Sequence, residues 1–239
     1  DDILTGFSAG SQAVARDNLD ASGVRVLTGV KPRDVTRDGD TRIITLSDGS
    51  TLSGTHVLNA TGRTPNTAML RALDPAPETA GSGALSINDR FETSVPGLYA
   101  IGDAADRLPL TPVATADGET LARQLYTDEM PEPLALDHVA TTAFVMPPVG
   151  EVGKLSGLAK LNRFSSLEDS IFRTGTTEAW GLARAEDGGL QGAALVGHAA
   201  AESISWAAQV TMTAPSRTGM NRARGVHPSS AEEPLNSNI

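Results

Sequence analysis

Seven residues near the C-terminal end, HPSSAEE from His227 to Glu233, place an imidazole a few positions before a pair of carboxylates. An imidazole titrates near neutral pH, and a carboxylate that hydrogen-bonds to it fixes its tautomer and raises its basicity. Pro228 disfavours a helix that runs through His227, so we expect the histidine on a rigid bend. His227 and Glu232 are therefore candidates for a general acid–base pair. The alternative is a polar tail in which an exposed histidine happens to precede a proline.

A second candidate site follows a short apolar run. Residues 98–101 (LYAI) are predicted to form a buried strand that stops abruptly at Gly102-Asp103. Ligands of open α/β folds sit beyond the carboxyl ends of such strands. Gly102 lets the backbone approach a ligand closely, and the Asp103 carboxylate can accept hydrogen bonds from sugar-like hydroxyls. The alternative is a Gly-Asp turn that caps a helix.

Two further segments have the backbone chemistry of ligand sites. In the run LTPVA, Thr111 is expected to be a helix N-cap with Pro112 in the first turn. Such a start points free backbone N–H groups at whatever precedes the helix. In the run ATGRTPN, residues 60–66, a strand is expected to enter a tight turn. An ordinary capped helix and a plain strand-end turn are the alternatives.

The composition excludes several classes of protein. The 239 residues carry a net charge of −10, which argues against nucleic acid as a partner. The absence of cysteine excludes disulfides, thiolate metal sites and a cysteine nucleophile within this chain, and we predict no metal site. No apolar run approaches the roughly 18 residues of a membrane span, and no signal peptide is recognisable, so a soluble cytoplasmic protein is expected.

Hydrophobic periodicity and turn signals predict the elements that position these residues. A helix is predicted over 11–22, a short strand over 24–27, and a hairpin over 41–58 with its turn at Asp48-Gly49. The helix that Thr111 starts is predicted to extend over 113–125. Beyond the prolines that follow it, an α+β segment is predicted with strands at 140–146, 178–184 and 190–196 and an Ala-rich helix at 199–210.

Taken in order, four segments resemble the flavoprotein disulfide reductases, the group that contains glutathione reductase, dihydrolipoamide dehydrogenase and mercuric reductase. The segments are NATGRTPN, TSVPGLYAIGDAADRLPLTPVA, TTAFVMPPVGEVG and GVHPSSAEE. LTPVA, PPVGEVG and HPSSAEE are most similar to glutathione reductases. The resemblance implies NADPH-dependent, FAD-dependent reduction of a low-molecular-weight disulfide. A relative of dihydrolipoamide dehydrogenase or mercuric reductase, or a non-catalytic dimerisation fragment, remain as alternatives.

The resemblance also implies roles for the residues around the flavin. Asp103 would hydrogen-bond the ribityl chain of FAD, with Gly102 allowing the approach. Thr111 matches the position whose backbone N–H meets the pyrimidine edge of the flavin and stabilises negative charge on the reduced ring.

Other roles concern the nicotinamide nucleotide and the substrate. Gly62 and Arg63 match a turn beside the nucleotide, and Thr142 lies where another nucleotide contact is expected. His227 and Glu232 would form an acid–base dyad that a homodimer delivers into the active site of the partner subunit. There the histidine would protonate the leaving thiol of the substrate and stabilise the flavin-proximal thiolate.

The implied fold is α/β plus α+β in three parts. Residues 1–67 would end a nicotinamide-nucleotide-binding domain, 68–134 would be a central FAD-contacting segment, and 135–239 would be the dimerisation domain. The glycine-rich motifs and the redox cysteine pair of the family have no counterpart here. The chain therefore looks like the C-terminal portion of a longer enzyme and is expected to be inactive alone.

One residue departs from the glutathione reductase pattern at the substrate. Glu119 occupies the position where glutathione reductases place an arginine for the carboxylate of the substrate. A carboxylate there would repel the negative groups of glutathione disulfide. The resemblance thus implies the reductase class, while Glu119 argues against glutathione itself as the substrate.

Overall fold

The computed structural model describes residues 2–156, 158, 160–165, 171, 175–213, 226, 229 and 233. Contacts divide the chain into two compact units. The first unit combines Asp1–Val57 with Asp137–Ile239, and the second is Leu58–Leu136. The assignment of these parts to nucleotide-binding, FAD-contacting and dimerisation domains stays a prediction.

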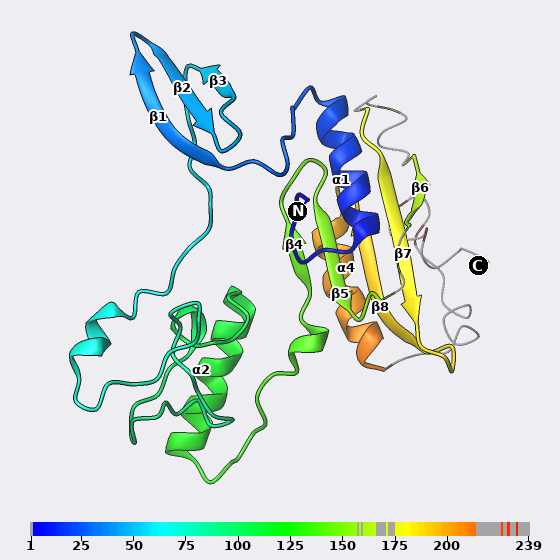
Figure 1. The fold of residues 1–239 in the computed structure, drawn as a ribbon. Coiled ribbons are helices and arrows are strands. Elements are labelled where there is room, and N and C mark those ends of the chain that lie inside the picture. Colours follow the sequence, from blue (N-terminus) through cyan, green and yellow to red (C-terminus); the bar gives the residue numbers. More distant parts are fainter. Residues whose placement is uncertain are drawn as a thin grey trace. The chain divides into compact units, whose positions relative to one another are not determined.

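A five-stranded antiparallel sheet forms the core of the first unit (Figure 1). Its strands, in the order in which they lie side by side, are β4 (Thr141–Ala143), β5 (Val149–Gly153), β8 (Leu190–Val196), β7 (Glu178–Arg184) and β6 (Asn162–Phe164). The predicted strands 178–184 and 190–196 are confirmed, while 140–146 is shortened to β4. Most residues of β7 and β8 are buried, so both faces of the sheet are covered.

Two helices cover the two faces of this sheet. Alternate residues of β8 point to opposite sides: Ala194 and Val196 pack in a cluster with α1 (Ala9–Ala21), and Ala193 and Leu195 pack in a cluster with α4 (Ala200–Met212). The predicted helices 11–22 and 199–210 are confirmed with ends shifted by one or two residues.

A buried carboxylate ties α1 to the sheet. Glu151 on β5 is 7% exposed and accepts hydrogen bonds from the Ser8 N–H at 3.0 Å and from the hydroxyls of Ser8 and Ser11, each at 2.5 Å. Ser8 is also the N-cap of α1, where its hydroxyl oxygen accepts from the Ser11 N–H. Buried polar atoms require such partners, so this cluster determines where the start of α1 lies on the sheet.

A separate three-stranded antiparallel sheet contains β1 (Pro32–Asp38), β2 (Thr41–Leu46) and β3 (Thr51–Gly54). The predicted Asp48-Gly49 turn joins β2 to β3, and Gly49 has φ +87°, which glycine adopts without strain. The hydroxyl and N–H of Ser50 donate to the Asp48 carboxylate, and these bonds hold the pKa of Asp48 below its usual range. The hairpin is confirmed, with its second strand ending at Gly54 instead of residue 58.

Two predicted strands, 24–27 and 98–101, are wrong. Residues 24–27 pair with no described strand, and neither does the end of the predicted hairpin, residues 55–58, where Leu58 is 90% exposed. Residues 98–101 form only an isolated bridge between Glu92 and Tyr99. Apolar side chains favour the extended backbone locally, but a strand exists only where a second strand supplies its hydrogen bonds.

The second unit is built on α2 (Thr111–Tyr126), with short 3₁₀ turns η1 (Ala68–Ala72) and η2 (Gly102–Ala104). Its small core contains Leu85, Ala100 and Ala105. In the described part of the chain, each helix is too short or too polar to cross a membrane.

Replacing Gly150 with alanine is expected to destabilise the first unit by about 1–3 kcal/mol, because extra atoms strain a filled core. A Cβ at Gly150 would lie 2.8 Å from Cγ2 of Ile204, a fully buried residue of α4, and 3.1 Å from the carbonyl oxygen of Ala200. Urea unfolding measures the change. Gly54→Ala is the control, since its Cβ would meet the His56 carbonyl oxygen at an ordinary 3.6 Å. Equal stability of the two variants would contradict the packing of α4 on β5.

Candidate functional site

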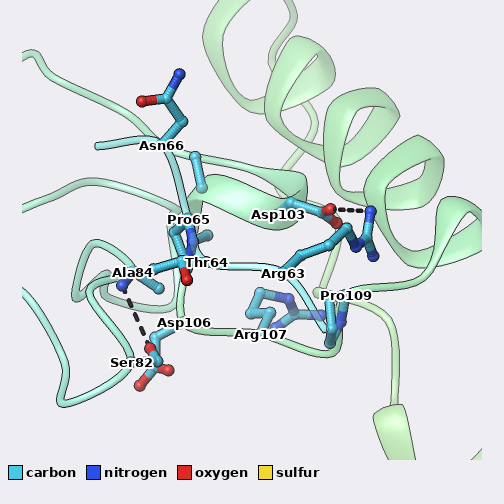
Figure 2. A pocket seen from close by; sticks show the side chains of 12 residues that line it. Arg63, Thr64, Pro65, Asn66, Ser82, Ala84, Asp103, Asp106, Arg107 and Pro109 are labelled. Carbon is cyan, nitrogen blue, oxygen red and sulfur yellow. Dashed lines mark hydrogen bonds and ion pairs between the residues drawn. The ribbon is translucent and has the colours of Figure 1, made fainter. Parts of the chain in front are cut away.

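A cavity of ≈ 610 Å³ lies within the second unit (Figure 2). Three segments line it: residues 63–66, the turn that contains Ser82 and Ala84, and the loop from Asp103 to Pro109. The first segment belongs to the run ATGRTPN and the last follows Gly102-Asp103. Two motifs that the sequence separates therefore meet at one cavity.

The Gly102-Asp103 turn opens the loop that forms one wall. Gly102 is buried with φ +60°, and a Cβ there would lie 3.2 Å from the Cβ of Ala114 on α2. Both the backbone conformation and the close approach to α2 therefore favour glycine. The side chain of Asp103 is 50% exposed and lies at the cavity. This position leaves the carboxylate accessible to a ligand.

Arg63 and Asp103 form an ion pair at the cavity, with Nη1 of Arg63 2.7 Å from Oδ2 of Asp103 (Figure 2). The side chains are 73% and 50% exposed, and an exposed pair of this kind contributes about 0–1 kcal/mol to stability. The pair matters for ligand binding, because it places a charged hydrogen-bond donor, the Arg63 guanidinium, beside a charged acceptor, the Asp103 carboxylate. A ligand that carries hydroxyls and phosphates can bind both.

The start of α2 differs from the prediction. Thr111 is the first helical residue, and Leu110, in extended conformation, is the N-cap. Leucine has no side-chain acceptor, and no side-chain cap hydrogen bond forms at this end. Pro112 occupies the first turn as predicted, where its missing N–H has no consequence. The first-turn N–H groups of α2 thus have no side-chain acceptor.

Sequence reasoning missed a buried pair behind the cavity wall, Arg107 and Asp117. The side chain of Asp117 is fully buried on α2, and its Oδ2 lies 2.9 Å from Nε of Arg107, which lines the cavity. Burial raises the pKa of the Asp117 carboxyl, and the Arg107 guanidinium opposes part of that rise. The sequence did contain a signal for the burial of Asp117: it follows Val113 by one helical turn, on the apolar face of the predicted helix.

Gly62, Glu119 and Thr142 are not among the residues that line the cavity. Gly62 has φ +102° in the turn before Arg63, and Glu119 is exposed on α2. Thr142 is half-buried on β4 in the first unit, opposite Gly150 in the strand register. His227 and Glu232 lie outside the described residues, so their pairing stays a prediction. Among the residues that the structure describes, no group of three histidine, aspartate or glutamate side chains is placed to hold a metal ion.

Comparison with known proteins places these features in a family. The family model for pyridine nucleotide-disulphide oxidoreductases matches residues 1–118. The chain is 30% identical to glutathione reductase of Burkholderia cepacia over 97% of its own length and 54% of the relative. It is 29% identical to trypanothione reductase of Leishmania donovani over 97% of its length and 49% of that protein. The chain thus spans about half the length of these two relatives.

Two proteins of Mycobacterium tuberculosis are also similar. One is an NAD(P)H dehydrogenase (quinone), 31% identical over 64% of the chain and 31% of that protein. The other is the crystal structure of LpdA, which has a TM-score of 0.74, 24% identity, and coverage of 94% of this chain and 51% of the other. This second match shows a shared fold. Together with the motifs at the cavity, these likenesses establish that the chain belongs to the pyridine nucleotide-disulphide oxidoreductase family and is similar to its glutathione reductases.

Proposed function

We propose that a longer enzyme carrying this chain reduces a low-molecular-weight disulfide with NADPH through FAD. Members of the family are FAD-dependent oxidoreductases that use NAD(P)H. The relatives aligned over nearly the whole chain are reductases of the disulfides of glutathione and trypanothione. The observation that carries the proposal is the cavity where Asp103, held beside Gly102, meets Arg63.

The residues at this cavity fit a flavin dinucleotide. A Cβ in place of the Gly102 hydrogen would meet α2, so glycine keeps the turn tight, and the Asp103 carboxylate would then bind a ribityl hydroxyl. Thr111 begins α2 without a side-chain cap, which leaves its N–H suited to the pyrimidine edge of the flavin. When bound, FAD would supply the electron transfer between the nicotinamide and the disulfide.

Arg63 keeps in this proposal the part that the resemblance implied, beside the nicotinamide nucleotide, although it contacts Asp103 in the structure. We assign Gly62, Arg63 and Thr142 to the side of the nicotinamide nucleotide. In the structure, however, the Arg63 guanidinium pairs with Asp103. A ribityl hydroxyl that binds Asp103 must share or displace Arg63, and the exposure of both side chains allows this. Arg63 would then be available for a phosphate or the nucleotide.

The acid–base part of the proposal rests on His227 and Glu232. A disulfide is reduced by attack of a thiolate, and the departing thiolate needs a proton. His227 would give that proton at Nε2 or Nδ1, and Glu232 would hold the imidazole in the required tautomer. In a homodimer, each dyad would serve the active site of the partner subunit.

A homodimer has support from the outward face of α4. Trp206 is 75% exposed, and Val210, about one turn further along this helix, is 38% exposed. Large apolar side chains gathered on one exposed face are typical of an interaction surface. This agrees with the proposal that residues 135–239 form the dimerisation domain.

Asp103→Ala is expected to weaken FAD binding by the 239-residue chain about tenfold, because it removes a charged hydrogen-bond acceptor from the ribityl chain. Titration of flavin fluorescence, extended to millimolar FAD, measures the affinity. Asp128→Ala is the matched control, since Asp128 is exposed and outside the cavity lining. Failure of the native chain to bind FAD, or equal affinity of the Asp103→Ala variant, would count against this cavity as the flavin site.

The mycobacterial quinone-reducing relative favours a second candidate, NAD(P)H-dependent reduction of a quinone. A quinone accepts electrons from reduced flavin without a departing thiolate, so this reaction would not need the His227–Glu232 dyad as an acid. Steady-state assays of the longer enzyme with a quinone and with a disulfide separate the two. Turnover only with the quinone would replace the disulfide proposal.

A further inference from the structure

The ion pair behind the cavity wall is unusual because one of its members has no access to solvent. Asp117 is 0% exposed, and its nearest described cation is Arg107, whose Nε lies 2.9 Å from Oδ2. The N–H is not well aligned with either carboxylate oxygen, so the contact is an ion pair without a well-formed hydrogen bond. A buried charge with such limited compensation carries a substantial desolvation cost. A hydrophobic residue at position 117 would avoid that cost.

Arg107 makes three contacts within the second unit and also lines the cavity. Besides Asp117, its guanidinium lies over the ring of Phe91, 5.6 Å from the centroid, and its Nη2 donates to the carbonyl oxygen of Leu134 at 3.3 Å. Its side chain is only 16% exposed, against 73% for Arg63 in the same cavity. Figure 2 shows Arg107 among the side chains that line the cavity. Arg107 is therefore the largely buried cation of the wall, and Arg63 is the exposed one.

Residues of α2 on either side of Asp117 also contact the chain just before the Asp103–Pro109 loop. The Gly102 backbone packs against Ala114, and Gly118 lies next to Ile101, where a Cβ would be 3.5 Å from Cδ1 of that isoleucine. Asp117 lies between these two small residues in the sequence of α2. The loop that begins with Asp103 is thus packed on α2 at its start and attached to α2 through Arg107 further along.

We infer that Asp117 is a positioning residue of the cavity: it holds Arg107, and Arg107 holds the Asp103–Pro109 loop in the arrangement that receives the flavin nucleotide. This inference rests on the proposed function, because it concerns the same cavity. It adds a residue that does not itself line the cavity and that acts only through Arg107.

The titration of Asp117 separates this role from a purely stabilising one. The ordinary pKa of the carboxyl is 3.8, and burial raises it in the folded chain. The native state therefore binds a proton more readily than the unfolded state, and the free energy of unfolding falls as the pH rises through the folded pKa. Ionisation of the Asp117 carboxyl therefore costs stability. A residue kept for stability alone would show the opposite dependence.

The test replaces the pair by apolar residues of similar size in the full 239-residue chain. Arg107→Met and Asp117→Leu are made singly and together, and FAD affinity and the unfolding temperature are measured on each. Replacing a buried ion pair in this way is often neutral or stabilising, so we expect the double variant to unfold no lower than the native chain. We expect its FAD affinity to fall about tenfold, with the two single losses failing to add because both act through one contact.

Two further variants keep the result interpretable. Asp117→Asn retains the shape of the side chain and removes its buried charge, and we expect weaker FAD binding without a lower unfolding temperature. Asp128→Asn removes an exposed carboxylate just beyond the end of α2 and should change neither quantity.

The outcomes are distinct. Native FAD affinity in the double variant and in Asp117→Asn would overturn the inference and leave the proposed function intact. A fall in affinity that accompanies a lower unfolding temperature in both would show a merely structural role and overturn it as well. Absence of FAD binding by the native chain would overturn the proposed flavin site, and the inference with it.

Discussion

Replacing His227 with alanine, in a longer enzyme that carries this chain, is expected to lower turnover with a disulfide substrate by roughly 10²–10⁴-fold. Reduction of the flavin by NADPH should change little, because that half-reaction involves no departing thiolate. The imidazole contributes only where a thiolate leaves and needs a proton, or where the flavin-proximal thiolate needs a cation nearby. Stopped-flow measurement of the two half-reactions separates the steps.

The neighbouring carboxylate provides a graded comparison. Glu232→Gln should reduce disulfide turnover less than His227→Ala, since it removes orientation and basicity but keeps the imidazole. Glu233→Gln is the matched control, because it changes an adjacent carboxylate outside the proposed dyad. Equal losses in both half-reactions for His227→Ala would eliminate the acid–base assignment.

Replacing Glu119 with arginine is expected to raise kcat/KM for glutathione disulfide roughly ten- to hundredfold in the same longer enzyme. A guanidinium supplies a bidentate partner for a substrate carboxylate, and a charged hydrogen bond contributes about 1.5–3 kcal/mol. Glu119 is exposed on α2, about two turns beyond Pro112, and it does not line the cavity. The prediction therefore requires that its exposed side faces the substrate and not open solvent.

The comparison of substrates decides whether this requirement is met. Wild type, Glu119→Arg and Glu119→Gln are assayed on glutathione disulfide and on a disulfide without carboxylates. If Glu119 faces the substrate, the ratio of the two specificity constants should rise moderately for glutamine, which only removes repulsion, and more for arginine. An unchanged ratio in both variants would make Glu119 an ordinary surface residue.

Local patterns were sufficient for much of the secondary structure. The apolar runs 178–184 and 190–196 became β7 and β8, and the Asp48-Gly49 turn became the connection between β2 and β3. These elements depend on side chains and turn residues that are close in the sequence. Residues 24–27 have a similar apolar pattern but no described partner strand, so the same reasoning failed there.

The sequence by itself determined the order of the motifs, and with it the family, as well as the residue types available for chemistry. Gly102-Asp103 was recognisable as a candidate ligand site from its local run, and Arg63 only through the resemblance to the family. Only the tertiary structure decided that Arg63 pairs with Asp103 and that Asp117 lies buried against Arg107. Only the structure showed Glu151 holding the start of α1 through Ser8 and Ser11. The physical reason is that the energy of a charge depends on its burial and its partners, and a folded chain brings these from segments that the sequence keeps far apart.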